Sequence, residues 1–280
     1  MVGRRTERWR ALRLPLTAIA LCAMPLIAGA ETVAARHLQG TTHGYLELRT
    51  AEGQVAAIGD LVQVVRGDRV TTHCTFRFKD GSVDDETTVF SQRGNFQLIS
   101  DHHIQKGPFF PHPMDLSIDT RSGEVTVKSL GKDGKEEVKT NHMKLPADLY
   151  NGMIVPITEN VRANVGEEDV SMIVAAPSPR LIKLKISPKG EEAFSVAGFE
   201  RKALHYEIKI ELGGVAGVVA PMIGKQPPNI QVWIEGGEVP GFVGEQGQIA
   251  DESPIVSIQQ TGPAMPATAH ASESHTGAGN

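Results

Sequence analysis

Strict alternation of apolar and polar residues is the feature that most limits how this chain can fold. From Leu204 to Leu212 every second residue is apolar, and the residues between are charged or polar. Successive side chains of a β-strand point to opposite faces, so this pattern predicts a half-buried strand. Four further segments alternate in the same way, with apolar positions at Cys74, Phe76 and Phe78; at Met114, Leu116 and Ile118; at Ile182, Leu184 and Ile186; and at Ile230, Val232 and Ile234.

Turn signals separate these segments and complete a mainly β pattern. Asp80-Gly81 and Asp133-Gly134 are dipeptides that favour tight hairpins. We count roughly ten to twelve strands between residues 40 and 260. The sequence therefore predicts a curved antiparallel sheet or half-open β-barrel with one short mid-chain helical insertion. The residues expected in its core are Phe76, Phe78, Leu184, Ile186, Tyr206, Ile208, Ile210, Val232 and Ile234.

The predicted helical insertion is Pro146–Val161. Apolar residues recur there at four-residue spacing, which is typical of one face of a helix. Asn151-Gly152 and Pro156 interrupt the pattern, so we expect two short helices or a broken one. The apolar stripe either packs on the back of the sheet or covers its concave side. In the second case the residues in contact with a ligand are Leu149, Met153, Ile154 and Ile157.

The two ends of the chain differ from the part between them. Five Arg precede an apolar run that ends in Ala28-Gly29-Ala30, which predicts a signal peptide over residues 1–30 and export to the periplasm or the medium. Residues 263–280 are Pro, Ala, Thr, Ser, His and Gly with few large apolar side chains. We expect a disordered tail there, and a single β-rich domain over residues 31–262.

Charge and cysteine content exclude some partners. Residues 1–30 hold five Arg and one Glu, so their removal leaves 23 basic and 32 acidic residues, a formal charge of −9. An acidic protein repels phosphate backbones, and nucleic acid is not an expected partner. Cys74 would then be the one remaining cysteine, which excludes an intrachain disulfide. No apolar run after residue 30 is long enough to predict a transmembrane segment.

The strongest concentration of reactive side chains is the segment 101–115. It holds His102, His103 and His112, residue types that bind zinc. Adjacent residues on a strand point to opposite faces, so we predict no metal site and keep these three histidines as the alternative. A two-residue turn at Asp80-Gly81 would also set Asp85 on the face of Phe76, where its pKa would be perturbed. We expect instead that Asp85 lies near an edge or that a bulge shifts the register, so that Asp84-Asp85-Glu86 flanks a solvated turn. The sequence has no nucleophile elbow, P-loop or dinucleotide motif, so we predict no catalytic residue and no cofactor.

Two segments carry a resemblance to a known family. Leu145–Met153 reads LPADLYNGM, and the strand Tyr206–Ile210 reads YEIKI. In this layout the chain resembles bacterial envelope proteins of the DUF3108 family, which look like relatives of lipoprotein carriers. The resemblance implies a curved antiparallel sheet that wraps a helix and an apolar cavity. It implies no catalytic residues.

Three functional classes follow from these observations. The first is an exported envelope protein that holds an apolar small molecule or lipid in a concave sheet. The second is a hydrolase or metal-dependent enzyme that uses the His- and Asp-rich segment 101–115. The third is a ligand-free scaffold that is structural or binds proteins. A cavity walled by aliphatic residues favours the first class, and a cleft with convergent His or carboxylate groups favours the second.

Overall fold

The computed structural model describes residues 32–131, 134–164, 166–175, 178–196, 198–212 and 227–262. The predicted signal peptide (1–30) and tail (263–280) lie outside these residues, as does Asp133 of the second predicted turn.

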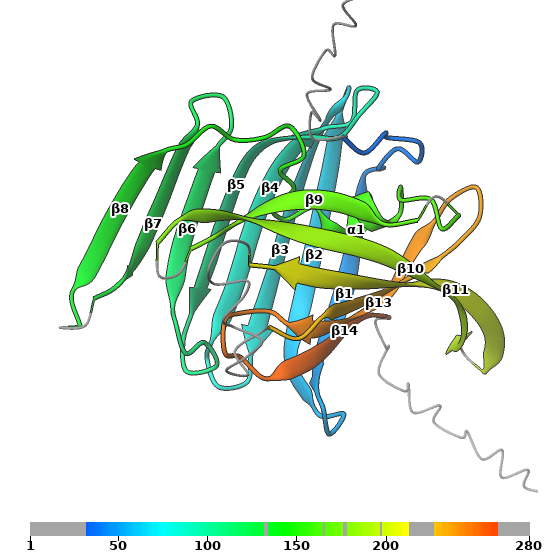
Figure 1. Cartoon of the computed structure of the whole chain (residues 1–280). Helices are drawn as coiled ribbons and strands as arrows, with labels where there is room; N and C mark the ends of the chain where they lie inside the picture. The colour runs from blue at the N-terminus through cyan, green and yellow to red at the C-terminus, as the bar shows by residue number, and fades with distance from the viewer. Residues whose placement is uncertain are drawn as a thin grey trace, which may run out of the picture.

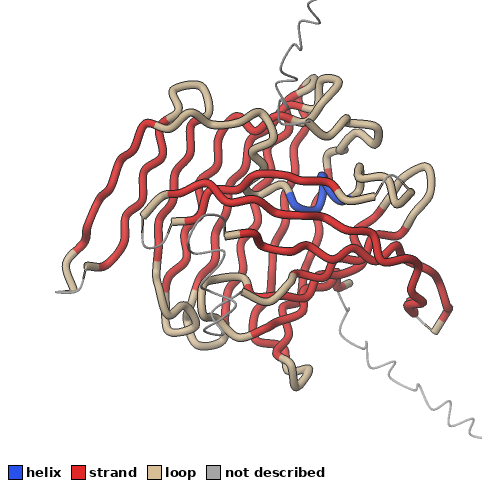
Figure 2. The backbone as a smooth tube through the Cα atoms, viewed as in Figure 1, coloured by secondary structure: helices blue, strands red, loops and turns tan. Residues whose placement is uncertain are grey.

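Strands make up nearly all the regular structure of the described residues, as Figure 2 shows. The single sheet has fourteen strands, more than the ten to twelve expected. The strands are β1 (Thr42–Thr50), β2 (Val55–Arg66), β3 (Arg69–Phe78), β4 (Val83–Ser91), β5 (Gln97–Lys106), β6 (Met114–Asp119), β7 (Glu124–Leu130), β8 (Glu136–His142), β9 (Glu168–Val174), β10 (Arg180–Val196), β11 (Phe199–Glu211), β12 (Ile230–Glu235), β13 (Gly241–Gln248) and β14 (Ile255–Thr261). Strands such as β8, which is polar except for Val138, and β13, which is rich in glycine, lack the alternation that reveals the others.

The strand order makes the sheet an open one. It runs β8-β7-β6-β5-β4-β3-β2-β1-β14-β13-β12-β11-β10-β9, so β1 and β14 pair at the centre and β8 and β9 form the edges. All thirteen pairings are antiparallel. Figure 1 shows β2–β8 as a wall of upright strands, with β9–β12 crossing in front of it. The sheet therefore bends back on itself and has a concave inner side.

Two apolar clusters lie on this inner side. The first cluster joins the two halves of the sheet, since it combines Leu116 and Val125 of the wall with Val170 and Ile208 of the crossing strands. The second cluster lies nearer the β1–β14 junction and consists of Leu46, Leu48, Ala57, Phe76, Phe78, Phe110 and Val256. The predicted core is confirmed in the two clusters, except that Ile210 is half-buried.

The helical insertion is shorter than predicted. The described helix, α1, spans Ile154–Thr158 only, and the segment before it is extended and turned. Gly152 has a φ of +65°, a left-handed conformation that a helix interior excludes. Even so, Leu149, Met153 and Ile157 are almost fully buried in the first cluster. The apolar stripe thus lies on the concave side, between the wall and the crossing strands (Figure 1), although one helix does not carry it.

The same segment covers the edge strand β9. Ser171 exchanges backbone hydrogen bonds with it, donating to Asp148 O at 2.8 Å and accepting from Tyr150 N at 2.9 Å. The Asn151 side chain accepts from the N–H of Ile173 at 2.8 Å and donates to its carbonyl at 2.9 Å. These contacts satisfy backbone groups that an uncovered edge strand would expose. The sequence predicted that Asn151-Gly152 interrupts a helix. In the structure the Asn151 side chain caps the edge of the sheet.

The other edge strand, β8, is protected by its composition. All seven of its residues are exposed, and most are charged or polar. Charged side chains on an edge oppose pairing with another chain.

Among the described residues, no helix has both the length and the hydropathy of a membrane span.

Candidate functional site

Polar side chains interrupt the inner surface of the sheet between the two apolar clusters. On β4 the inward positions are Asp84, Glu86 and Thr88, and on β5 they include Asp101 and His103. Four carboxyl groups and one imidazole make up what we call the inner carboxylate cluster: Asp84, Glu86, Asp101, Glu245 and His103. Glu245 belongs to β13, so the cluster is assembled from strands far apart in the sequence.

The position of Asp84 depends on the turn that precedes β4. Phe78 N–H donates to Ser82 O at 3.0 Å, which closes a turn of three residues rather than two. Its last residue, Gly81, has a φ of +88°, the left-handed geometry of a three-residue hairpin. Phe76 therefore pairs with Asp84, and Asp84 points inward.

The inner position considered for Asp85 is consequently wrong, and the expected shift in register is found, although it comes from the turn rather than from a bulge. The three-residue turn sets Arg77 opposite Val83 rather than Asp84, and Asp85 moves to the outer face. Its carboxylate accepts from Thr75 Oγ1 at 2.7 Å and lies 3.0 Å from His73 Nε2. Burial acts to raise the pKa of Asp85, but these two hydrogen bonds outweigh it and leave the pKa lowered. The carboxylate that points inward is therefore that of Asp84, one residue earlier.

His103 is the cationic centre of the cluster. Its Nε2 lies 2.7 Å from Asp84 Oδ1, and its Nδ1 lies 3.5 Å from Glu86 Oε1. Burial alone would lower its pKa, but Glu86 and Asp84 outweigh burial and raise the pKa to about 10. The imidazole is therefore protonated at neutral pH.

Three carboxyl groups of the cluster, Glu86, Asp101 and Glu245, hold protons more tightly than usual. Burial raises the pKa of Glu86, and His103 opposes this shift. Burial and the charge of Glu86 raise the pKa of Asp101 to about 8, and burial raises the pKa of Glu245 to about 7. Solvent still reaches part of the cluster, because the Glu86 side chain keeps 27% of its accessible surface. Raised carboxyl pKa values on an inner, partly accessible surface mark a candidate functional site.

Two of these carboxyl groups are incompletely paired among the described residues. Asp101 is 2% exposed; its Oδ1 accepts from Thr88 Oγ1 at 2.9 Å, and its buried Oδ2 has no hydrogen-bond partner. The Glu245 side chain has no hydrogen bond or ion pair with any residue that the structure describes. A buried polar atom without a partner is costly, so Asp101 Oδ2 calls for an explanation. Glu245 is half-buried.

An aromatic group adjoins the inner carboxylate cluster. Phe78 contacts Phe109 and Phe110, with ring centroids 4.4 and 5.4 Å away. The Phe76 ring packs directly over Gly59 of β2. A Cβ added to Gly59 would lie 2.5 Å from the ring, so this contact requires glycine. Burial raises the pKa of the nearby Cys74 thiol, so it is a hydrophobic neighbour rather than a nucleophile.

The structure separates the three histidines of the alternative metal site. His102 points outward and lies 2.9 Å from Asp115, whereas His103 points inward. His112, in the turn after β5, lies 3.4 Å from Glu252. Among the described residues, no group of three or more His, Cys, Asp or Glu side chains is arranged to hold a metal ion.

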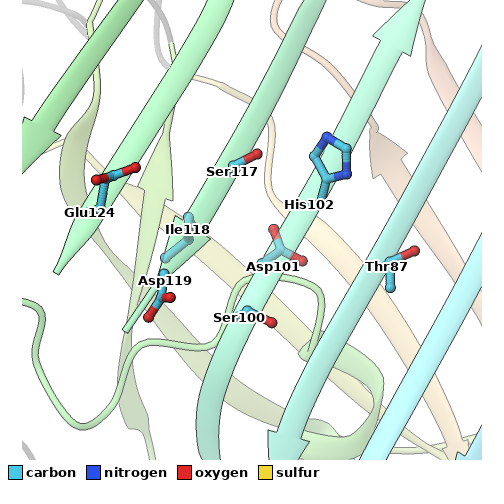
Figure 3. A pocket seen from close by; sticks show the side chains of 8 residues that line it. All are labelled: Thr87, Ser100, Asp101, His102, Ser117, Ile118, Asp119 and Glu124. Atoms are coloured by element: carbon cyan, nitrogen blue, oxygen red, sulfur yellow. The ribbon is translucent and has the colours of Figure 1, made fainter. Parts of the chain in front are cut away.

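One pocket includes a single member of the inner carboxylate cluster, Asp101, and a second pocket includes none. Figure 3 shows the larger, of about 370 Å³, where Thr87, His102 and Ser117 line up across the outer face of β4–β6. The second, of about 230 Å³, lies beside Tyr206 and Ile234. The predicted ligand contacts Leu149, Met153, Ile154 and Ile157 line neither pocket. Three of them are almost fully buried and Ile154 is half-buried.

The sequence held a signal for this site that the alternation analysis missed. Several inward positions of β4 and β5 hold polar residues, so in that part of each strand both faces are polar. A strand that is polar on both faces in a chain otherwise strictly alternating points to an inner polar site. The participation of Glu245 could not be inferred, because it depends on the bend that brings β13 over β3–β5.

Comparisons with known proteins give limited information. No family model matches the chain, and no curated protein does. The chain is similar to a solved structure, a beta-barrel-like protein of the domain of unknown function DUF1849 from Brucella abortus. The two are 8% identical, the match covers 80% of this chain and 97% of the other, and the TM-score is 0.42. We draw nothing from this match, since the large antiparallel sheet is established by the structure itself, and the resemblance to the DUF3108 family stays a prediction.

Proposed function

We propose that this chain is an exported, non-catalytic envelope protein that holds a small molecule with an apolar part on the inner side of its bent sheet. The observation that carries the proposal is the inner surface itself. It is not one continuous core, because the solvent-accessible inner carboxylate cluster separates two apolar clusters. Proteins that need only stability seldom leave unpaired carboxyl groups in such a place.

Other observations support parts of this proposal. Export rests on the basic and apolar order of residues 1–30. A carrier-like role rests on the resemblance of Leu145–Met153 and Tyr206–Ile210 to DUF3108 proteins. The apolar ligand, a lipid or another small molecule, would contact Phe109 of the second cluster and the half-buried Ile154 beside the first. Leu149, Met153 and Ile157 would form the wall behind Ile154.

The geometry favours a binding protein over the hydrolase alternative. A histidine acts as a general base in its neutral form. Because Glu86 and Asp84 raise the pKa of His103 to about 10, its imidazole is already protonated at neutral pH. Cys74, the nearby thiol, has a raised pKa and is a poor nucleophile.

The test is ligand recovery combined with a binding assay. We expect organic extracts of the natively purified protein to contain a stoichiometric small molecule in mass spectra. The protein should also take up the neutral apolar dye N-phenyl-1-naphthylamine, and Phe109→Ala should weaken uptake by about tenfold through lost contact area. Val138→Ala on the exposed strand β8 is the matched control and should have no effect. An empty extract together with no dye uptake would support a ligand-free scaffold instead.

A further inference from the structure

We infer that the inner carboxylate cluster binds the ammonium group of an alkylamine-type ligand, whose hydrocarbon part rests against the phenylalanines of the second cluster. This inference rests on the proposed function and adds the chemical class of the ligand.

The first argument is charge. Four carboxyl groups face a single imidazole within the cluster. Carboxylates removed from water must be protonated or paired with a cation. Asp84 has His103 at 2.7 Å and Gln105 Nε2 at 3.1 Å. Glu86, Asp101 and Glu245 do not each have two such donors among the described residues. These carboxyl groups therefore favour binding of a cation.

The second argument is independent of the number of charges. Asp101 is almost completely buried, yet its Oδ2 accepts no hydrogen bond. Thr88 Oγ1 donates a hydrogen bond to the other oxygen, Oδ1. Gly152 packs against both residues, and a Cβ added to it would lie 3.0 Å from Asp101 Oδ1. Asp101 pairs with Thr88 two positions along from the Glu86–His103 pair, so it lies beside these two groups and interacts electrostatically with both. An unpaired acceptor of this kind fits an N–H donor of a ligand.

The third argument is convergence from two walls. The carboxyl groups of Glu86, Asp84 and Glu245 all act on the Cys74 thiol, so β13 brings Glu245 to the groups of β3–β5. Glu245 has no hydrogen bond or ion pair within the described chain. A ligand cation between the walls would neutralise Glu245 and Glu86 together.

The ligand chemistry follows from the surroundings. The described side chains form no metal-binding arrangement, whereas an ammonium group has three N–H donors and accepts a looser cage of oxygens. Phenylalanine rings attract cations over their faces and also accept hydrocarbon. Phe76 lies directly opposite Asp84 in the strand register. The cluster and its aromatic neighbours together suit a cationic head on an apolar chain.

The experiment is calorimetric titration of the full exported chain at about pH 8, where an alkylamine is still charged. The probes are octylamine, its neutral analogue octanol, and spermidine. We expect octylamine to bind at least about tenfold more tightly than octanol, since one charged hydrogen-bonded pair has that magnitude. Glu245→Gln and Asp101→Asn should each reduce octylamine affinity by about tenfold. Asp115→Asn removes a carboxylate from the outer face and should leave the affinity unchanged.

Each outcome has a defined meaning. Spermidine binding that is weakened by Glu245→Gln also supports the ammonium site and identifies a free polyamine as the source. Equal affinity for octylamine and octanol, or an unchanged octylamine affinity in Glu245→Gln, overturns the inference. If the neutral dye still binds in that case, the proposed function stands without it. If neither the dye nor any amine binds, both fail.

Discussion

Met153→Asp is expected to lower the free energy of unfolding by about 3–5 kcal/mol, because it places an unpaired carboxylate in the core. Met153 is fully buried and belongs to the first cluster together with Leu149 and Ile157. These neighbours offer no hydrogen-bond donor from their side chains. Urea unfolding followed by circular dichroism measures the change.

Met153→Leu is the matched control for this substitution. It conserves volume and apolarity and should cost less than about 1.5 kcal/mol. If Met153→Asp costs no more than Met153→Leu, then residue 153 has access to water, and the segment before α1 does not fill the concave side.

Gly152→Ala is expected to destabilise the protein by about 2–5 kcal/mol, from backbone strain combined with a steric clash. Gly152 has a φ of +65°, and a Cβ would lie 1.9 Å from Thr88 Oγ1. Thr88 holds Asp101 by a hydrogen bond, so relief of the clash would disturb the inner carboxylate cluster as well. The free energy of unfolding in urea is again the readout.

Gly53→Ala separates the two causes. Gly53 has a similar φ of +78°, but nothing lies within 4 Å of its ideal Cβ position. This control should show only the backbone cost, about 1 kcal/mol. Equal losses in the two variants would mean that Gly152 does not pack against β4 as the structure has it.

Local pattern was a good guide to the strands of this protein and a poor guide to their register. Ile208 and Val232 could be assigned to the core because alternation depends only on neighbouring residues. The face of Asp85 could not, because a single extra residue in the turn at Gly81 reverses every side chain that follows it in β4. The turn length depends on interactions that the Asp-Gly pair alone does not reveal.

The prediction of one short mid-chain helix is confirmed, but its extent was wrong for a different reason. The apolar spacing from Leu149 to Ile157 fits a helix, and these residues are buried as expected. The part before α1 nevertheless extends along β9, because the backbone of Asp148 and Tyr150 completes the hydrogen bonds of Ser171. That requirement comes from a strand later in the chain, so no local pattern reports it. The same limit applies to the inner carboxylate cluster, whose members meet only after the sheet has bent.

The binding proposals depend on one claim, that the inner cluster contains carboxyl groups without compensating partners in the free protein. Glu245 tests it most simply. Burial raises its pKa from 4.5 to about 7 in the folded state. Above the unfolded pKa the folded chain binds more protons than the unfolded chain, so stability falls as pH rises toward and through about 7. Glu245→Gln removes this loss.

The most direct measurement is therefore the difference in unfolding free energy between Glu245→Gln and the parent protein, both refolded free of ligand, as a function of pH. We predict a difference near zero at about pH 4 that becomes a stabilisation on the order of 1–3 kcal/mol at about pH 9. Asp85→Asn, on the outer face where hydrogen bonds lower the carboxyl pKa, should instead destabilise the protein at neutral pH. A Glu245→Gln variant that is less stable than its parent at about pH 9 would mean that the carboxylate already has a partner, and would contradict the claim.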